Sequence, residues 1–102
     1  TMLDYKEVPN IQVVTLAPKQ LCVAIAIKLL EVRGEYITSD AIGEITGMTK
    51  ERARALIHIL EHRGIAHVTS KTWDKTNRWQ YKLTKFGEDT LRNSIKDILD
   101  GE

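Results

Sequence analysis

The spacing of apolar positions changes along this chain, and the change separates helical from extended parts. Residues 18–33 hold no helix breaker between Pro18, which suits a first helical turn, and Gly34, which suits a helix end. Apolar residues cover nearly every side of this helix, whereas a surface helix of a monomer has one apolar face. We therefore expect it to lie at the centre of the fold or to be covered on one side by another subunit, with Cys22 as a buried, inert thiol.

Two further helices are predicted, joined by a turn at Gly47. The first spans residues 39–46, begins where several polar side chains offer N-caps, and has its inward positions at Ala41, Ile42 and Ile45. The second spans residues 49–63, with Thr49 as its N-cap and a buried face at helical spacing formed by Ala53, Leu56, Ile57 and Leu60. Two helices joined by a glycine-containing turn are typical of a helix-turn-helix.

After the second of these helices the apolar period falls to two, which indicates strands. Residues 65–83 form a predicted hairpin, in which Trp79 alternates with Tyr81 and Leu83 and is therefore expected in the core. A final helix is predicted over residues 85–100. The expected fold class is α+β and mainly helical, with three helices, a two-stranded hairpin and a C-terminal helix.

The length of 102 residues suits a single domain. We assign residues 18–102 to this domain and residues 1–17 to an N-terminal arm, which either lies on the domain as an extended segment or reaches a partner subunit. A single cysteine excludes an intrachain disulfide, and neither a signal peptide nor an apolar run long enough for a membrane span is recognised. These features predict a cytoplasmic protein with no membrane partner.

The net charge of +1 conceals an uneven distribution. Residues 49–85 hold nine basic and three acidic side chains, a balance of +6, whereas residues 1–48 and 86–102 have balances of −2 and −3. A basic segment between acidic flanks is typical of a surface that binds a polyanion, although an ordinary solvated face fits it as well. No phosphate-binding glycine loop, nucleophile elbow or apolar pair of carboxylates favours an enzyme.

Two motifs extend this interpretation. The helix-turn-helix ends with the motif Leu60-Glu61-x-x-Gly64-Ile65, and the hairpin ends with the motif Tyr81-x-Leu83-Thr84-x-x-Gly87. Together they resemble the winged helix-turn-helix regulators, especially the MarR-like and PadR-like groups, over about residues 21–91. The resemblance implies a transcriptional regulator that binds double-stranded DNA, usually as a homodimer. Both flanks are shorter than is usual in these groups, so the dimer contacts are expected on the first and last helices.

In a helix-turn-helix the second helix enters the major groove and its first turns contact base edges. Arg54 is the first candidate for a base contact, because a guanidinium pairs bidentately with guanine, while Glu51 either accepts from a cytosine amino group or stabilises the helix N-terminus. On the hairpin, or wing, we expect Lys75 to contact phosphate and Arg78 to enter the minor groove. The predicted DNA-binding residues are Ser39, Thr49, Lys50, Glu51, Arg52, Arg54, His58, Lys71, Lys75, Asn77 and Arg78.

Apolar positions on the first and last helices predict how copies of the chain associate. The predicted dimer interface consists of Leu21, Ile25, Leu91, Ile95, Ile98 and Leu99. The alternative is a monomer that binds beside a partner protein. His58 and His62 have the spacing of metal ligands, but a site needs further ligands, so we predict no metal and no cofactor.

Two other functions remain open at this point. A winged helix also serves as a protein-interaction module, which the apolar first helix and arm favour. A plasmid or phage partition or replication factor would instead bind arrays of repeated DNA sites.

Overall fold

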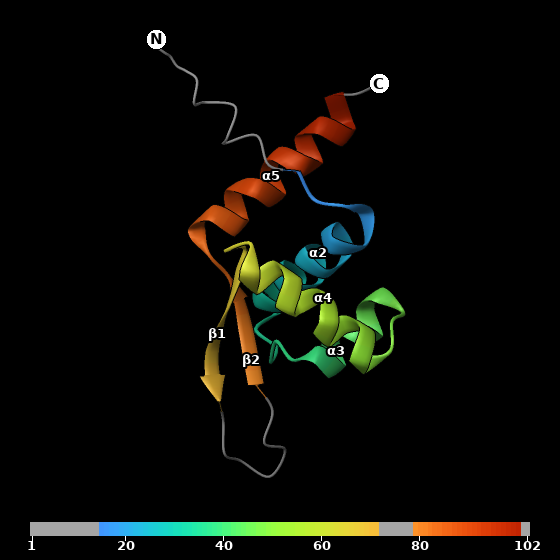
Figure 1. Ribbon diagram of the computed structural model, residues 1–102, viewed down its shortest axis with the longest axis vertical. Coiled ribbons are helices and arrows are strands. Elements are labelled where there is room, and N and C mark those ends of the chain that lie inside the picture. The colour runs from blue at the N-terminus through green and yellow to red at the C-terminus, as the bar shows by residue number, and fades with distance from the viewer. Residues whose placement is uncertain (1–14, 72–78, 101–102) are drawn as a thin grey trace.

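The computed structural model of the protein describes residues 15–71 and 79–100, apart from the side chains of residues 70 and 71. The elements in chain order are α2 (Pro18–Arg33), α3 (Ser39–Thr46), α4 (Lys50–His62), β1 (Ala66–Lys71), β2 (Trp79–Leu83) and α5 (Lys85–Asp100). This order confirms the predicted fold class. The hairpin extends from one end of the body, and α5 crosses the opposite end (Figure 1).

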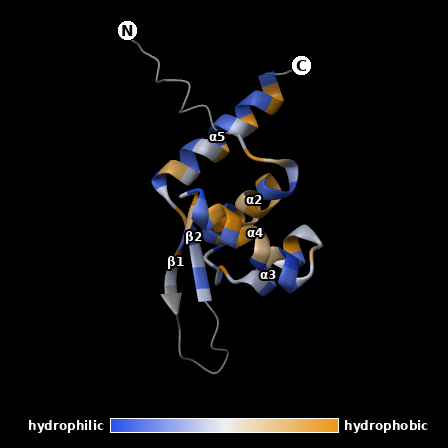
Figure 2. Cartoon of the chain, viewed as in Figure 1, coloured by the Kyte–Doolittle hydropathy of each residue, from blue (hydrophilic) through white to orange (hydrophobic). Residues whose placement is uncertain are grey.

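Helix α2 lies at the centre of the fold, where it packs against α3, α4, α5 and β2. Apolar residues of α2 and α4 gather in the middle of the body (Figure 2). The predicted burial of Cys22 is wrong, because Cys22 lies away from the buried face of α2 and its thiol is exposed. Ile25 and Val32 are also 42% and 74% exposed. One side of α2 therefore fills the core, while the described residues leave its other side uncovered.

The strands β1 and β2 are antiparallel, and the inner end of β2 is joined to the body. The backbone nitrogen of Tyr81 donates to the carbonyl oxygen of Ile37, just before α3, at 3.0 Å. Val68 lies opposite Tyr81, but the next pair is Ser70 and Gln80, so the register shifts by one residue. Such a β-bulge increases the local twist of the hairpin.

The predicted core position of Trp79 is wrong. Tyr81 and Leu83 on the same strand are buried as expected, whereas Trp79 is 42% exposed. Trp79 lies beyond the bulge, opposite Lys71 at the outer end of the described ladder. The three side chains do alternate with polar ones along β2, as predicted. However, the end of β2 that carries Trp79 extends past the body, which covers only Tyr81 and Leu83.

The turn between α3 and α4 brings two backbone segments very close together. A Cβ atom at Gly43 would lie 2.8 Å from the carbonyl oxygen of Met48. The carbonyl oxygen of Gly43 in turn accepts from the backbone nitrogens of Gly47 and Met48 at 2.8 and 3.0 Å. On α3, Ile42 and Gly43 are buried, whereas Ile45 is exposed. The prediction that Ile45 points inward is therefore wrong.

The two motifs that carry the resemblance meet in space. The hydroxyl of Thr84 donates to the carbonyl oxygen of Gly64 at 2.6 Å and accepts from the backbone nitrogen of Gly87 at 2.9 Å, which caps α5. The backbone nitrogen of Thr84 also donates to the carbonyl oxygen of Ile65 at 2.9 Å. Gly87 lies directly against the backbone of Ile65, where a Cβ atom would fall on the carbonyl oxygen. We call these four residues the corner joint.

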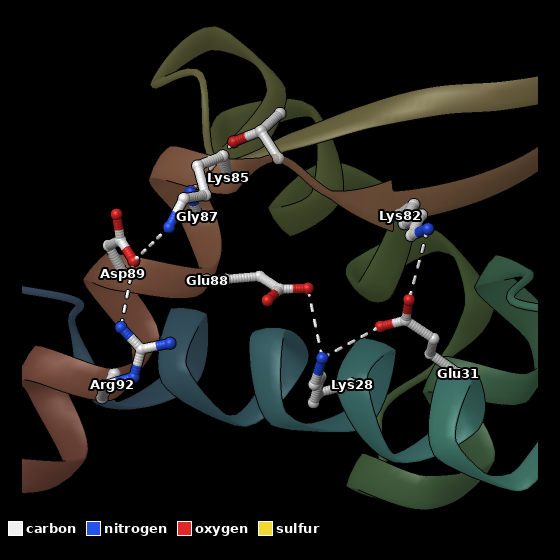
Figure 3. Close-up of polar contacts among 9 residues, drawn as sticks. Lys28, Glu31, Lys82, Lys85, Gly87, Glu88, Asp89 and Arg92 are labelled. Atoms are coloured by element: carbon white, nitrogen blue, oxygen red, sulfur yellow. Dashed lines mark hydrogen bonds and ion pairs between the residues drawn. The ribbon is translucent and has the colours of Figure 1, made fainter.

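A small ion-pair network connects α2, α5 and β2 (Figure 3). Lys28 Nζ lies 3.1 Å from Glu88 and 3.3 Å from Glu31, and Lys82 Nζ lies 3.4 Å from Glu31. Partial burial works to raise the pKa of Glu31, but the hydrogen bonds from Lys28 and Lys82 outweigh it and lower the pKa overall. The hydrogen bonds to Glu88 and Glu31 raise the pKa of Lys28.

Replacing Gly87 with alanine tests the corner joint. Alanine favours a helix over glycine by about 1 kcal/mol, so helix propensity alone would make Gly87→Ala stabilising. We expect the opposite, a loss of about 2–4 kcal/mol in the free energy of unfolding, because the new methyl group overlaps the backbone of Ile65. Urea denaturation measures this change. Gly34→Ala is the control: its Cβ would meet no atom within 4 Å, so only the positive φ of 71° costs about 1–2 kcal/mol.

The acid stability of the fold should depend on Glu31. Since its pKa is lower in the folded chain than in the unfolded one, its contribution is complete above the usual pKa of a glutamate and is lost as the pH falls through the folded value. In Glu31→Gln, urea denaturation between about pH 6 and about pH 3 should therefore show a shallower loss of stability than in wild type. Asp89→Asn is the matched loss of a carboxylate whose two ion pairs lie within α5 alone. Equal slopes for wild type and Glu31→Gln would contradict this account.

Candidate nucleic-acid interface

Helix α4 buries the predicted apolar face and turns its polar face outward. Its buried residues are the predicted set of Ala53, Leu56, Ile57 and Leu60. At 100° per residue, the positions opposite this face are Glu51, Ala55, His58 and His62, all of them exposed. Lys50 and Arg54 flank this outer line on one side and Arg52 flanks it on the other, so three cations surround the first two turns of the exposed face.

The three cations of α4 differ from two other basic residues of the same segment. Lys50, Arg52 and Arg54 are exposed and form no ion pair with another residue that the structure describes. Lys82, in contrast, pairs with Glu31, and both terminal nitrogens of Arg63 donate to α2 and to the residues before it. The basic side chains of this segment therefore fall into two groups. Some hold parts of the fold together, and others remain available to a polyanion.

The N-terminus of α4 is exposed and is capped by a side chain. Thr49 Oγ1 accepts from the backbone nitrogen of Arg52 at 3.1 Å, which confirms Thr49 as the N-cap. The exposed start of the helix carries the positive end of its dipole. At the start of α3, in contrast, Thr38 is the cap and Ser39 is only 9% exposed. Ser39 is thus largely buried in this structure, and its place among the DNA-binding residues stays a prediction.

The charge of Arg54 acts on Tyr81 of β2. Burial raises the pKa of the Tyr81 hydroxyl, the negative charge of Glu61 adds to the rise, and the positive charge of Arg54 opposes it. Arg54 is thus within electrostatic reach of β2. Because β2 is one strand of the wing, a duplex that contacts the wing would also lie near Arg54.

His58 is exposed on the outer line of α4, with Nδ1 3.3 Å from Glu61 Oε1. It can contact DNA from this position. Within the described residues, no group of three histidine, cysteine or acidic side chains is arranged to hold a metal ion.

The wing is described only in part. Lys71 ends β1, but its side chain and all of Lys75, Asn77 and Arg78 lie outside the described residues, so these contacts stay predictions. Trp79, at the outer end of the described part of the wing, is exposed and was not among the predicted DNA-binding residues. Its position in an alternating strand predicted a place in the core. The sequence does not show that this part of the strand extends beyond the body, where the side chain is exposed.

The predicted dimer residues separate into two groups. Leu91 is 7% exposed and belongs to the core, which corrects its assignment to the interface, and Leu21 is partly buried against the same core. Ile25, on α2, is exposed, as are the remaining three on the distal half of α5, namely Ile95, Ile98 and Leu99. The described residues leave these four side chains open to a partner.

No protein-family model matches this chain, and no curated protein matches it. Its structure is similar to that of the PcaV transcriptional regulator from Streptomyces coelicolor, solved with its natural ligand, with a TM-score of 0.70 and 20% identity over 89% of this chain and 62% of PcaV. A mutant of MepR from S. aureus gives a TM-score of 0.68 and 17% identity over 84% of this chain and 62% of MepR. The transcriptional repressor CouR, bound to a DNA duplex, gives a TM-score of 0.68 and 22% identity over 83% of this chain and 56% of CouR.

These similarities define the fold. PcaV, MepR and CouR are winged-helix regulators of the MarR family, and this chain shares their fold, as its two motifs predicted. The chain spans less than two thirds of the length of each of them. Separately, none of the helices that the structure describes has the length and apolar character required to cross a membrane.

Proposed function

We propose that this chain binds a specific sequence of double-stranded DNA, with α4 in the major groove, and acts as a transcriptional regulator. The observation that carries the proposal is a group of three cations, Lys50, Arg52 and Arg54, on the exposed face of the second helix of a helix-turn-helix. None of the three forms an ion pair with a residue that the structure describes. Such a helix docks with its N-terminal residues at the base edges. The fold that the chain shares with PcaV and with DNA-bound CouR supports the same function.

The roles of three exposed residues of α4 and of its N-cap follow from their chemistry. The Arg54 guanidinium pairs with guanine, and Glu51 accepts from a cytosine amino group. The Thr49 cap and the first free backbone amides of α4 hold a phosphate, to which Lys50 adds a positive charge. The wing residues Lys75 and Arg78 then follow the backbone or enter the adjacent minor groove.

We also propose that the protein binds as a homodimer on a palindromic site. Ile98 continues the face of α5 that buries Leu91 and Ser94, but it is 57% exposed because it lies past the body. Ile95 and Leu99 extend this apolar surface along the same helix. A second copy would cover it and place two copies of α4 on successive half-sites. We expect the regulator to work in the cytoplasm, without catalytic activity.

A protein-interaction module is the second candidate, because the outer side of α2 is apolar and exposed at Cys22, Ile25 and Val32. Such a module would copurify with a partner and would not shift a duplex near physiological salt. A partition or replication factor would shift DNA, but it would prefer arrays of repeated sites over a single operator.

Selection of duplexes from a random pool, followed by alanine variants, tests the proposal. Arg54→Ala should relax the preference at a single base pair of each half-site, a change of about 1–3 kcal/mol in discrimination, because it removes a base contact. Lys50→Ala should weaken binding to all sequences alike and lower the slope of log affinity against log salt by about one.

The matched control is Arg92→Ala, which removes an exposed arginine of α5 that pairs with Asp89 and lies away from α4. It should keep the wild-type preference and salt slope. Equal affinity of wild type and Arg54→Ala for every duplex in the pool would refute sequence reading by α4.

A further inference from the structure

Arg63 follows the last residue of α4, and its guanidinium binds the start of α2. Nη1 donates to Gln20 Oε1 at 2.6 Å, and Nη2 donates to the carbonyl oxygen of Thr15 at 3.1 Å. Hydrogen bonds from a charged donor are stronger than those between neutral groups, and the planar guanidinium fixes the direction of both. The C-terminal end of α4 is thereby held against residues 15–20, which we call the 15–20 bridge.

The 15–20 bridge is fixed to α5 as well. The backbone nitrogen of Leu16 donates to Ser94 Oγ at 3.3 Å, and both residues are buried. The N-cap of α2 is Ala17, which offers no side-chain cap, so the start of this helix depends on its contacts with α4 and α5. The bridge therefore joins the end of α4 to the middle of α5.

This connection matters because α4 packs mainly on α2, α3 and β1, whereas α5 packs on α2 and β2. The N-terminal end of α4 is set by the tight turn at Gly43 and Met48. Its C-terminal end is held by the corner joint and, on the side of α2, by Arg63. A helix held at both ends has one direction relative to α5, and loss of the Arg63 contact would allow that direction to vary.

We propose that Arg63 is a positioning residue that sets the direction of α4 relative to α5, and thereby the spacing of DNA half-sites that the protein accepts. The proposal rests on the proposed function, including the homodimer whose contacts lie on α5. Although Arg63 belongs to the basic segment, its guanidinium is engaged by Gln20 and by the Thr15 carbonyl oxygen, and we assign it no contact with DNA. Its loss should therefore change the tolerated spacing while leaving the base preference and the salt slope unchanged.

The experiment begins with site selection by the wild-type protein. Wild type, Arg63→Met, Gln20→Ala and the double variant are then titrated with the selected duplex and with duplexes whose half-sites are moved by one or two base pairs. Arg63→Met should bind the optimal spacing about threefold to tenfold more weakly and should discriminate less between spacings. Gln20→Ala should reproduce this in part, and the double variant should be no worse than Arg63→Met, because both changes remove the same contact.

Three measurements accompany each titration: base preference within a half-site, the salt slope and the unfolding midpoint. Arg33→Met, the matched loss of an exposed arginine at the end of α2, should keep the wild-type spacing preference. A salt slope lower by about one in Arg63→Met, with spacing preference unchanged, would show a phosphate contact and overturn the proposal. Equal weakening at every spacing, with a lower unfolding midpoint, would show a purely structural role and would also overturn it.

Two outcomes separate this proposal from the proposed function. Selection of a single, undivided site would overturn the spacing role of Arg63 and leave DNA binding intact. Selection of no sequence at all would refute the proposed function, and the positioning role with it.

Discussion

The corner joint determines where the functional elements of this domain lie. Thr84 bonds to the Gly64 carbonyl and caps α5, while Gly87 packs directly on the backbone of Ile65. The end of α4, the start of the wing and the start of α5 therefore meet within a few residues. Because a side chain at Gly87 would fill the space, this contact requires glycine, and the direction in which the wing leaves the body depends on it.

The charges of the domain are divided between two tasks. Lys28, Glu31, Lys82 and Glu88 join α2, β2 and α5, and Arg63 joins α4 to the 15–20 bridge. Lys50, Arg52 and Arg54 lie on the exposed face of α4, where residues 15–71 and 79–100 offer them no ion-pair partner. An unpaired cation keeps its full attraction for a phosphate or a base, whereas a paired one has to give up its partner first. The first group joins elements of the fold to one another, and the second group remains exposed on α4.

Local patterns in the sequence were sufficient for the elements and for the buried face of α4. The Thr49 cap, the glycine turns and the spacing of Ala53, Leu56, Ile57 and Leu60 depend on neighbouring residues alone, so the sequence predicted them correctly. The errors at Cys22, Ile45, Trp79 and Leu91 have another origin. Periodicity assigns residues to faces of a helix or strand, but it does not show how far the rest of the body covers each face.

From the sequence, the candidate site could be predicted as a stretch of the chain, but not residue by residue. Sequence spacing placed Lys50 and Arg54 on an outer face, but it did not distinguish them from Lys82 and Arg63, whose partners lie 51 and 43 positions away in the chain. Ser39 was assigned to the surface because it begins a helix, yet the helix-turn-helix buries it. Long-range contacts decide which polar groups stay available, and a single sequence does not specify them.

The central claim is that α4 enters the major groove, and methylation interference tests it most directly. Duplexes of the selected site are methylated sparsely at guanine N7, which faces the major groove, or at adenine N3, which faces the minor groove, and bound and free fractions are compared. We expect N7 methylation to exclude binding at one or more guanines of each half-site, where the Arg54 guanidinium would lie. Binding that tolerates methylation at every guanine N7 and is blocked only at adenine N3 would contradict this account of the protein.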